Sequence, residues 1–167
     1  MADTMSIAHI ETDDDIDAAR DLVREFFAYA ASLDPHASEA HPFQELEREL
    51  AGLPGKYAPP GGVFLLARLN GAPVGCGAYY TRHEGTAEIR RMFVRPEARG
   101  KAIGWQILSG LIEAARDAGM EQIILGTYYK LEAAQALYKR AGFTHCPPFD
   151  EVPPMYEGKL VFMERAL

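Results

Sequence analysis

The stretch RMFVRPEARGKAIGW, residues 91–105, combines the end of a strand, a tight turn and the start of a helix. Residues 92–94 are apolar and suit a pleated surface, and Pro96 then ends the strand because it lacks an N–H. Apolar residues at helical spacing follow from about Ala102 to Ala118, with Gly119 after the helix end. Free N–H groups at a helix start, with basic side chains nearby, form an anion site. The stretch can hold a diphosphate, although an ordinary strand-to-helix turn would have the same pattern.

The chain has 167 residues, for which we expect a single domain, residues 1–167, with a substantial core. Its apolar fraction of 48% and charged fraction of 25% are ordinary for a globular protein. The net charge of −7 argues against a nucleic-acid partner, because phosphate binding requires a basic face. An acidic chain mildly favours a cationic partner, but acidity also serves solubility.

The cysteines and histidines give no sign of a metal site. Cys76 and Cys146 match no metal or disulfide spacing, and the histidines His41, His83 and His145 are not spaced as ligands. No segment approaches the roughly 18 apolar residues of a membrane span, and the acidic N-terminus does not resemble a signal peptide. We therefore predict no metal, no membrane partner and a cytoplasmic location.

The remaining pattern predicts a mixed sheet with helices on both faces. Upstream of the opening stretch we expect a strand at 7–10, helices over 12–32 and 43–50, a Gly- and Pro-rich loop at 52–62, and antiparallel strands at 63–69, 73–80 and 86–94. Downstream we expect a strand at 121–127, a helix at 132–140 and a strand region that starts at Phe143. Prolines at 147, 148, 153 and 154 interrupt this region, and a last strand follows at 159–163.

A whole helix separates the strand at 86–94 from the strand at 121–127, so these two can lie parallel within a mostly antiparallel sheet. The fold class is therefore α/β (α+β). The anion turn lies at the C-terminal end of its strand, where open sheets usually bind ligands. The sequence leaves the oligomeric state open, although a sheet edge near Lys159 to Met163 could support a homodimer.

Two common phosphate-binding motifs are absent from this turn. It lacks Gly-Lys followed by Ser or Thr, and no Asp is well placed for magnesium. The turn also lacks the Gly-x-Gly-x-x-Gly pattern of dinucleotide-binding folds. The sequence thus disfavours a nucleotide-binding protein of another class.

Three segments together resemble the GNAT superfamily of acyl-CoA-dependent N-acyltransferases. They are Val94-Arg95-Pro96, the turn from Arg99 to Gly104, and Leu137-Tyr138-Lys139-Arg140-Ala141-Gly142-Phe143. The resemblance covers the element order from about Ile7 to the end, and it reaches motif level between Glu88 and Phe143. Residues 53–57 and 153–164 are similar to a bacterial subgroup of general acetyltransferases.

The resemblance implies acetyl-CoA as the cosubstrate. In the family the two central parallel strands splay apart, which would open a slot for the pantetheine arm. Backbone groups near the end of the first strand would pair with the pantetheine amides, and N–H groups of the turn would hold the diphosphate. The implied cofactor-binding residues are Met92, Phe93, Val94, Arg99, Gly100, Lys101, Ala102, Ile103, Gly104 and Trp105.

The sequence departs from the family motif at two positions. The third turn position, usually Gly, is Ala102, and we expect an α-region dihedral there that tolerates Ala and leaves its N–H free. The Asn often found at the start of the last motif helix is replaced by Leu131. Any cofactor contact made by that Asn is missing here or supplied by another group.

The chemistry of acyl transfer requires a base for the amine and an acid for the thiolate. Glu88 is the best candidate base: strand parity places it on one face with Arg90, Met92 and Val94. It could instead be solvated or paired with Arg90 or Arg91, and His83 and Glu84 are weaker candidates for the base.

The resemblance implies that Tyr138 is the general acid, because a phenol holds its proton at pH 7 and can still donate it to a thiolate. The alternative is a helix residue that merely packs in the core. Backbone N–H groups near Met92 to Val94 could stabilise the oxyanion.

The sequence gives fewer indications of the acceptor pocket. Aromatic residues could line it, and Tyr128 and Tyr156 are preferred because they follow the parallel strand and lie in the proline-rich return. Glu84 and the acidic first helix could receive a cationic amine. We therefore expect an enzyme that transfers acetyl from acetyl-CoA to a primary amine of a small molecule or peptide. The alternative is a non-catalytic acyl-CoA-binding sensor or assembly module, which the presence of both Glu88 and Tyr138 disfavours.

Overall fold

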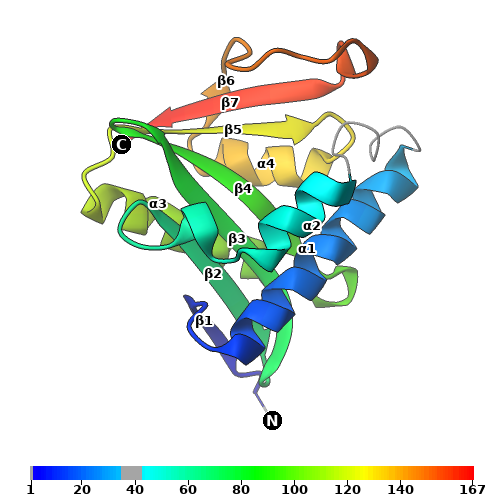
Figure 1. The fold of residues 1–167 in the computed structure, drawn as a ribbon, viewed down its shortest axis with the longest axis vertical. Coiled ribbons are helices and arrows are strands. Elements are labelled where there is room, and N and C mark those ends of the chain that lie inside the picture. The colour runs from blue at the N-terminus through cyan, green and yellow to red at the C-terminus, as the bar shows by residue number, and fades with distance from the viewer. Residues whose placement is uncertain (1, 35–42) are drawn as a thin grey trace.

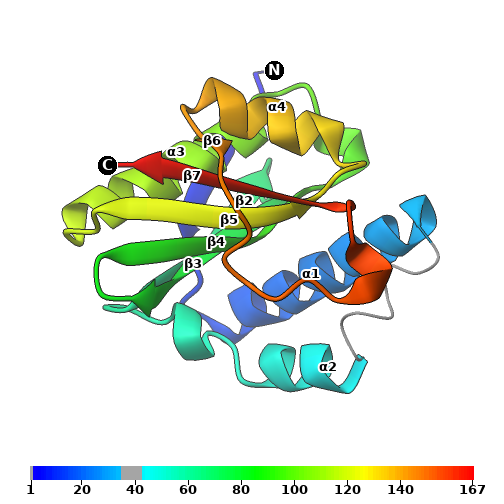
Figure 2. The same ribbon diagram turned by 90° about the horizontal axis from the view of Figure 1, so that it is seen from above.

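The structure is a computed structural model that describes residues 2–34 and 43–167. Across these residues one mixed sheet runs through the molecule, and helices cover both of its faces (Figures 1 and 2). The strands follow the spatial order β1-β2-β3-β4-β5-β7-β6. Their bounds are β1 Met5–His9, β2 Gly62–Leu69, β3 Ala72–His83, β4 Thr86–Val94, β5 Gln122–Tyr128, β6 Thr144–His145 and β7 Leu160–Ala166. The helices are α1 Asp13–Leu33, α2 Phe43–Ala51, α3 Ile103–Asp117 and α4 Glu132–Arg140, with short 3₁₀ turns η1 Gly55–Tyr57, η2 Pro96–Ala98 and η3 Pro154–Tyr156.

Each face of the sheet has its own hydrophobic core. Helices α3 and α4 lie on one face, and α1 and α2 lie on the other (Figure 2). Alternation along a strand sends successive side chains to opposite cores. In β2, Val63 and Leu65 pack with α3, whereas Phe64 and Leu66 pack with α1. The predicted α/β (α+β) class with helices on both faces is confirmed.

Local sequence signals account for the joints between the elements. Asn70 and Gly71, with φ of 53° and 84°, make the predicted hairpin turn between β2 and β3. Helix α1 begins with a capping box, in which the Thr12 hydroxyl accepts from the Asp15 N–H at 3.1 Å and Asp15 accepts from the Thr12 N–H. Helix α3 ends before Gly119, whose φ of 79° is the left-handed conformation expected after a helix.

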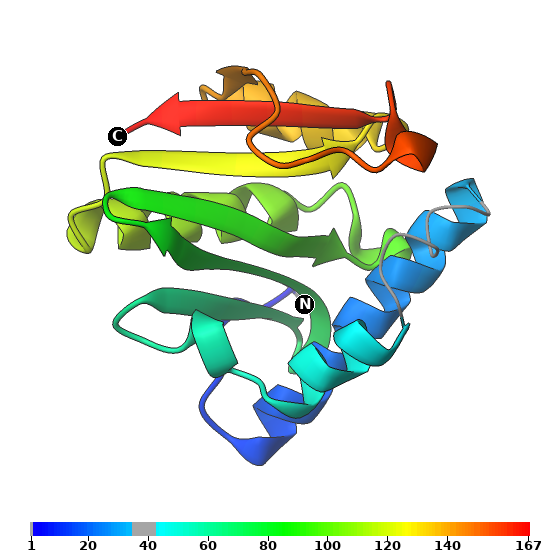
Figure 3. The same ribbon diagram turned by 45° about the horizontal axis from the view of Figure 1, so that its top comes forward.

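Strands β4 and β5 are parallel, as predicted, but they pair over only part of their length. Their register runs from Thr86 opposite Gln122 to Ile89 opposite Leu125 and then stops. Beyond this point the two strands diverge (Figure 3). The predicted splay of the central strand pair is therefore present. It leaves the backbone of residues 90–94 without a β5 partner.

A β-bulge interrupts β4 at the same place. Arg91 has a φ of 62°, and the register with β3 shifts between Cys76 opposite Phe93 and Ala78 opposite Arg90. A bulge adds one residue to a strand and reverses the faces of everything that follows it. The sequence pattern of β4 gave no sign of this extra residue.

The far edge of the sheet differs from the prediction. Strand β7 is not the edge, because β6 pairs with it at Thr144 opposite Glu164 and at His145 opposite Met163. The edge proposed at Lys159 to Met163 is thus partly covered, and a homodimer stays a prediction. Within the described ranges, no helix is both long and apolar enough to cross a membrane.

Candidate active site

A cavity of about 330 Å³ opens where β4 and β5 diverge. Its walls come from both strands, from α1 and α4, from β7, and from the return segment between β6 and β7, residues 146–159. Most of the lining side chains are apolar or aromatic, and the charged ones gather at one wall. The cavity is lined by Phe26, Phe27, Ala30, Glu88, Ile89, Arg90, Arg91, Met92, Gly126, Thr127, Tyr128, Leu131, Ala134, Tyr138, Phe149, Asp150, Glu151, Pro153, Tyr156, Leu160 and Phe162.

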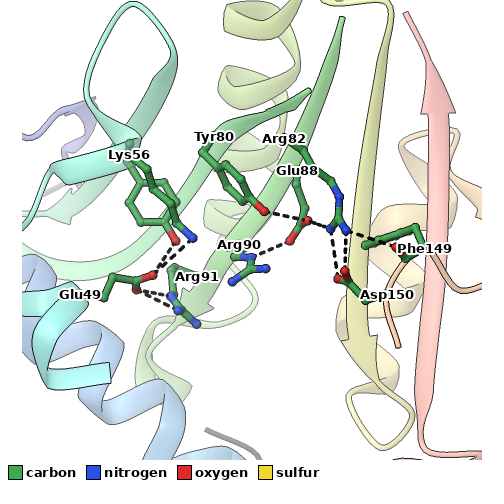
Figure 4. Close-up of polar contacts among 10 residues, drawn as sticks. Glu49, Lys56, Tyr80, Arg82, Glu88, Arg90, Arg91, Phe149 and Asp150 are labelled. Carbon is green, nitrogen blue, oxygen red and sulfur yellow. Dashed lines mark hydrogen bonds and ion pairs between the residues drawn. The ribbon is translucent and has the colours of Figure 1, made fainter. Parts of the chain in front are cut away.

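Glu88 lies at the charged wall, within a network of hydrogen bonds (Figure 4). Its Oε1 accepts from the Tyr80 hydroxyl at 3.1 Å and from Nη1 of Arg82 at 2.5 Å. Its Oε2 accepts from Nε of Arg90 at 2.5 Å. The residue is only 4% exposed, and these hydrogen bonds compensate for the water contacts that the carboxylate loses on burial.

The network leaves Glu88 one position for a further donor. A carboxylate offers about four lone-pair sites, two on each oxygen. Tyr80 and Arg82 occupy those on Oε1, and Arg90 occupies one on Oε2. A water or an amine in the cavity can use the remaining site on Oε2.

Arg82 connects Glu88 to the return segment. It forms an ion pair with Asp150 as well as with Glu88, and Nη2 donates to the Phe149 carbonyl at 3.2 Å (Figure 4). The Arg82 guanidinium holds the pKa of Asp150 below its usual value. Arg82 thereby ties the 149–150 wall of the cavity to the strand that carries Glu88.

The prediction that Glu88 shares one face with Met92 and Val94 is wrong, although it does share a face with Arg90. Glu88 and Arg90 share a face with Ala78 and Tyr80, on the side of α1 and α2. Met92 instead packs in the α3 core, and a Cβ on Gly77 would lie 2.5 Å from its sulfur. The bulge at Arg91 causes the reversal, and it moves Val94 to the α3 side as well.

Tyr138 enters the cavity from α4, on the face opposite Glu88. It is 5% exposed, and its ring packs on Phe143 with centroids 5.8 Å apart. Its hydroxyl has no hydrogen-bond partner among residues 2–34 and 43–167. Burial raises the pKa of this phenol, so the group stays protonated well above neutral pH. A protonated hydroxyl without a protein acceptor is free to donate to a ligand.

The predicted anion turn lies at the start of α3. The first hydrogen bond of the helix runs from the Gln106 N–H to the Ala102 carbonyl at 3.1 Å. The N–H groups of residues 103–105 therefore have no acceptor within the helix. Arg99 lies over the Tyr29 ring at 4.8 Å, and Lys101 forms a 2.7 Å ion pair with Asp3. The cofactor-binding role of residues 92–94 and 99–105 stays a prediction, for which the free N–H groups and nearby cations are suitable.

Ala102 does not have the expected right-handed dihedral. It is the N-cap of α3, with φ of 61° and ψ of 20° in the left-handed region. A side chain at this conformation costs about 1–2 kcal/mol relative to the right-handed region. The glycine usual at this position of the motif would avoid that cost. The second departure, Leu131, is the N-cap of α4, makes no side-chain cap and lines the cavity.

The two preferred acceptor-site tyrosines lie together in the cavity wall. Tyr128 and Tyr156 pack edge to face with ring centroids 6.5 Å apart. The Tyr128 hydroxyl donates to Oδ2 of Asp34, which lies 3.3 Å from Nζ of Lys159. Burial and the Asp34 carboxylate raise the pKa of Tyr128. Glu84, by contrast, is exposed in the β3–β4 turn and does not line the cavity.

Sequence reasoning missed several residues of the site. Arg82 and Asp150 are 68 positions apart, and Asp34 and Tyr128 are 94 apart, so no local pattern connects them. The alternation of β3 could have placed Tyr80 and Arg82 on the face of Glu88. No group of three metal-ligating side chains occurs among the described residues, and His41 lies outside them.

Comparisons with known proteins give a consistent match. A family model described as the acetyltransferase (GNAT) family matches residues 16–143. The chain is 35% identical to an "IAA acetyltransferase" of Azospirillum brasilense over 152 residues, which are 90% of this chain and 92% of that protein.

Solved structures also match over nearly the whole chain. One from Klebsiella pneumoniae, provisionally assigned as an acyl-CoA N-acyltransferase, has a TM-score of 0.74 at 29% identity and covers 98% of both chains. An N-acetyltransferase of Thermoplasma acidophilum in complex with coenzyme A has a TM-score of 0.73 at 16% identity, covering 98% of this chain and 99% of that one. The second likeness concerns the fold alone.

Proposed function

The chain belongs to the acetyltransferase (GNAT) family and is an acyl-CoA-dependent N-acetyltransferase, and from this premise we propose that it acetylates a primary amine of a small molecule or peptide by direct attack on the thioester. Acetyl-CoA is the cosubstrate. The proposal includes a cytoplasmic location and a homodimer.

The divergence of β4 and β5 is the observation that carries the proposal. It opens a cavity between the sheet strands with Glu88 on one side and Tyr138 on the other. A base and an acid are the two groups that thioester aminolysis needs. The unpaired backbone of β4 beyond Ile89 is available to the pantetheine amides, as an added strand would be.

The diphosphate of acetyl-CoA would lie at the start of α3. The free N–H groups of the turn and the positive end of the helix dipole favour an anion there. Arg99 and Lys101 add positive charge in a chain whose net charge is −7. This arrangement fits a cosubstrate that enters at the turn and reaches along β4 into the cavity.

The reaction can then be written with its protons accounted for. Glu88, directly or through a water at Oε2, takes a proton from the ammonium group of the acceptor. The neutral amine forms a C–N bond with the thioester carbonyl carbon, and backbone N–H groups near Met92 to Val94 stabilise the oxyanion. When the C–S bond breaks, Tyr138 donates its proton to the thiolate. The nitrogen then loses its second proton, which returns through solvent to the Tyr138 phenolate. Glu88 releases its proton to solvent, so each turnover releases one proton.

The alternative is a sensor that binds acyl-CoA without turning it over. A thiol-release assay with acetyl-CoA and a panel of primary amines separates the two. We expect amine-dependent release of CoA by the wild-type chain. Tight CoA binding in calorimetry, together with no release for any amine or amine-bearing peptide, would favour the sensor instead.

A further inference from the structure

Arg90 presents an unused hydrogen-bonding edge to the cavity. Its Nε is engaged with Glu88, and its guanidinium carbon lies 5.3 Å from the Tyr80 ring centroid. Its two terminal nitrogens donate to no acceptor in the described part of the chain, as Figure 4 shows for the residues drawn. The side chain is 30% exposed and lines the cavity. A held guanidinium with a free edge matches the geometry of a carboxylate.

The neighbouring cations have their own partners, which singles out Arg90. Arg91 donates from Nε to Oε2 of Glu49 at 2.8 Å, and its Nη2 is also 2.8 Å from that oxygen. Lys56 lies 3.8 Å from Oε1 of Glu49 and 4.2 Å from the Tyr80 ring centroid. Burial first, and then the positive charge of Arg90, lowers the pKa of Lys56. Lys56 and Arg91 share the single carboxylate of Glu49, so the net charge on the side of Arg90 away from Glu88 is positive.

The carboxylates of this region do not reach the free edge. Glu49 pairs with Arg91 and Lys56, and Asp150 pairs with Arg82. Glu151 lines the cavity but is exposed, where water screens its charge. An anionic group in the cavity is thus the partner that Arg90 lacks.

We propose that the acceptor is an α-amino acid with an apolar side chain, whose carboxylate binds the free edge of Arg90. The inference rests on the proposed function and specifies its substrate class. The ion pair of Arg90 with Glu88 places a positive and a negative group side by side. An α-amino acid carries the complementary pair on one carbon, so its amine faces the open site on Oε2 of Glu88 when its carboxylate faces Arg90.

The rest of the cavity selects the side chain of the amino acid. Away from the charged wall the lining is apolar or aromatic and includes Phe26, Leu131, Leu160 and Phe162. A volume of about 330 Å³ is at the small end of ligand pockets, which run from roughly 300 to 1,000 Å³. The acyl end of the cosubstrate shares this space, which leaves room for a small acceptor.

The test compares amino acids with analogues that lack the carboxylate. We would measure kcat/KM by thiol release for phenylalanine, leucine and methionine, each beside its decarboxylated amine and its amino-acid amide. The amine is more basic than the amino acid and the amide is less basic, so a preference over both cannot come from basicity. We expect at least one amino acid to be preferred about 10- to 100-fold, the range of a charge-assisted bidentate contact.

Substitution of Arg90 gives the second arm of the test. Arg90→Gln also removes the ion pair with Glu88, so some loss is expected for every acceptor. The loss of kcat/KM should be about 10- to 100-fold larger for the preferred amino acid than for its decarboxylated amine, with an unchanged KM for acetyl-CoA. Arg90→Lys should restore part of the preference. Arg24→Gln is the matched control, because Arg24 pairs with Glu47 on the surface, away from the cavity.

Each outcome decides the inference. Equal kcat/KM for amino acids and amines, or an equal loss for both classes in Arg90→Gln, would overturn it. If no compound is turned over, the proposed function fails. Titration of the amino acids into CoA-loaded protein, followed by calorimetry, then tests the carboxylate site at Arg90 separately. Binding of the amino acids to wild type but not to Arg90→Gln would support the site, and absence of binding to wild type would refute it.

Discussion

Glu88 and Met92 lie four residues apart on β4, yet their side chains occupy opposite faces of the sheet. Glu88 contacts Tyr80 on the side of α1 and α2, whereas Met92 packs against the α3 core. The bulge at Arg91 lies between them, and β5 has already left β4 at this point. The cavity therefore passes through the sheet. A carboxylate from one face and the phenol of Tyr138 from the other can approach the same thioester.

Replacing Glu88 with Gln should lower kcat about 100-fold or more at neutral pH, since a general base contributes 10²- to 10⁴-fold. The KM for acetyl-CoA should change little. A base is needed because the amine is protonated, so the defect should shrink as the pH rises toward the pKa of the amine. A defect of constant size across pH would indicate a structural role. Glu113→Gln, on the exposed side of α3, is the control.

Replacing Tyr138 with Phe should lower kcat about 100-fold while KM for acetyl-CoA and the free energy of unfolding stay nearly unchanged. The ring contact with Phe143 is retained, and the hydroxyl gives up no protein hydrogen bond among the described residues. Because burial raises the pKa of Tyr138, the wild-type kcat should not fall on the alkaline side until the pH exceeds about 10. Tyr79→Phe, in the same core but outside the cavity, is the control. Equal kcat in Tyr138→Phe would remove this residue from the mechanism.

A negative charge at Gly104 should weaken cosubstrate binding. Gly104→Asp places a carboxylate in the first turn of α3, beside the N–H groups proposed to hold the diphosphate, and KM for acetyl-CoA should rise about tenfold or more. A Cβ there would lie 3.3 Å from Leu137, so Gly104→Ala measures the steric part. An acidic residue at a helix start favours the helix, so the variant should stay folded. An unchanged Kd for CoA in calorimetry would contradict the placement of the diphosphate.

The sequence predicts the fold well because its signals are local. Periodicity gives the helices, Asn70-Gly71 gives the hairpin, and the helix between β4 and β5 gives their parallel pairing. The site is harder to predict because long-range contacts build it. The bulge at Arg91 has no sequence mark, since an arginine at positive φ is held by its surroundings and not by its own preference. Alternation therefore places Glu88 and Arg90 on one face, as observed, and places Met92 on the wrong face.

The N-cap of α1 should make stability depend on acid pH. Two backbone N–H groups, of Glu11 and Thr12, and then Arg68 lower the pKa of Asp15 to about 2. The unfolded value is about 3.9, so the stabilisation is fully present above that pH and is lost as the pH falls toward 2. Asp15→Asn should lower the free energy of unfolding by about 0.5–2 kcal/mol at pH 6.

Denaturant unfolding of both proteins between pH 6 and pH 2.5 measures this difference. The difference should narrow as the pH falls below about 4, because the Asp15 carboxylate of the unfolded chain takes up a proton there while that of the folded protein stays ionised down to about pH 2. Asp14→Asn, at the neighbouring first-turn position, is the control. A difference that stays constant over this range would show that the charge of Asp15 is not what stabilises the helix start.

Ala102→Gly should stabilise the protein, although glycine loses more conformational entropy on folding than alanine does. Ala102 has a φ of 61°, where a Cβ costs about 1–2 kcal/mol, and glycine recovers this strain while losing about 0.5–1 kcal/mol of chain entropy. The net gain in the free energy of unfolding should be about 0.5–1 kcal/mol by denaturant titration. Ala118→Gly at the other end of α3 is the matched control, because Ala118 has a φ of −78° and carries no such strain. That variant should be neutral or destabilised. Equal destabilisation of both variants would mean that the left-handed conformation at the start of α3 carries no strain.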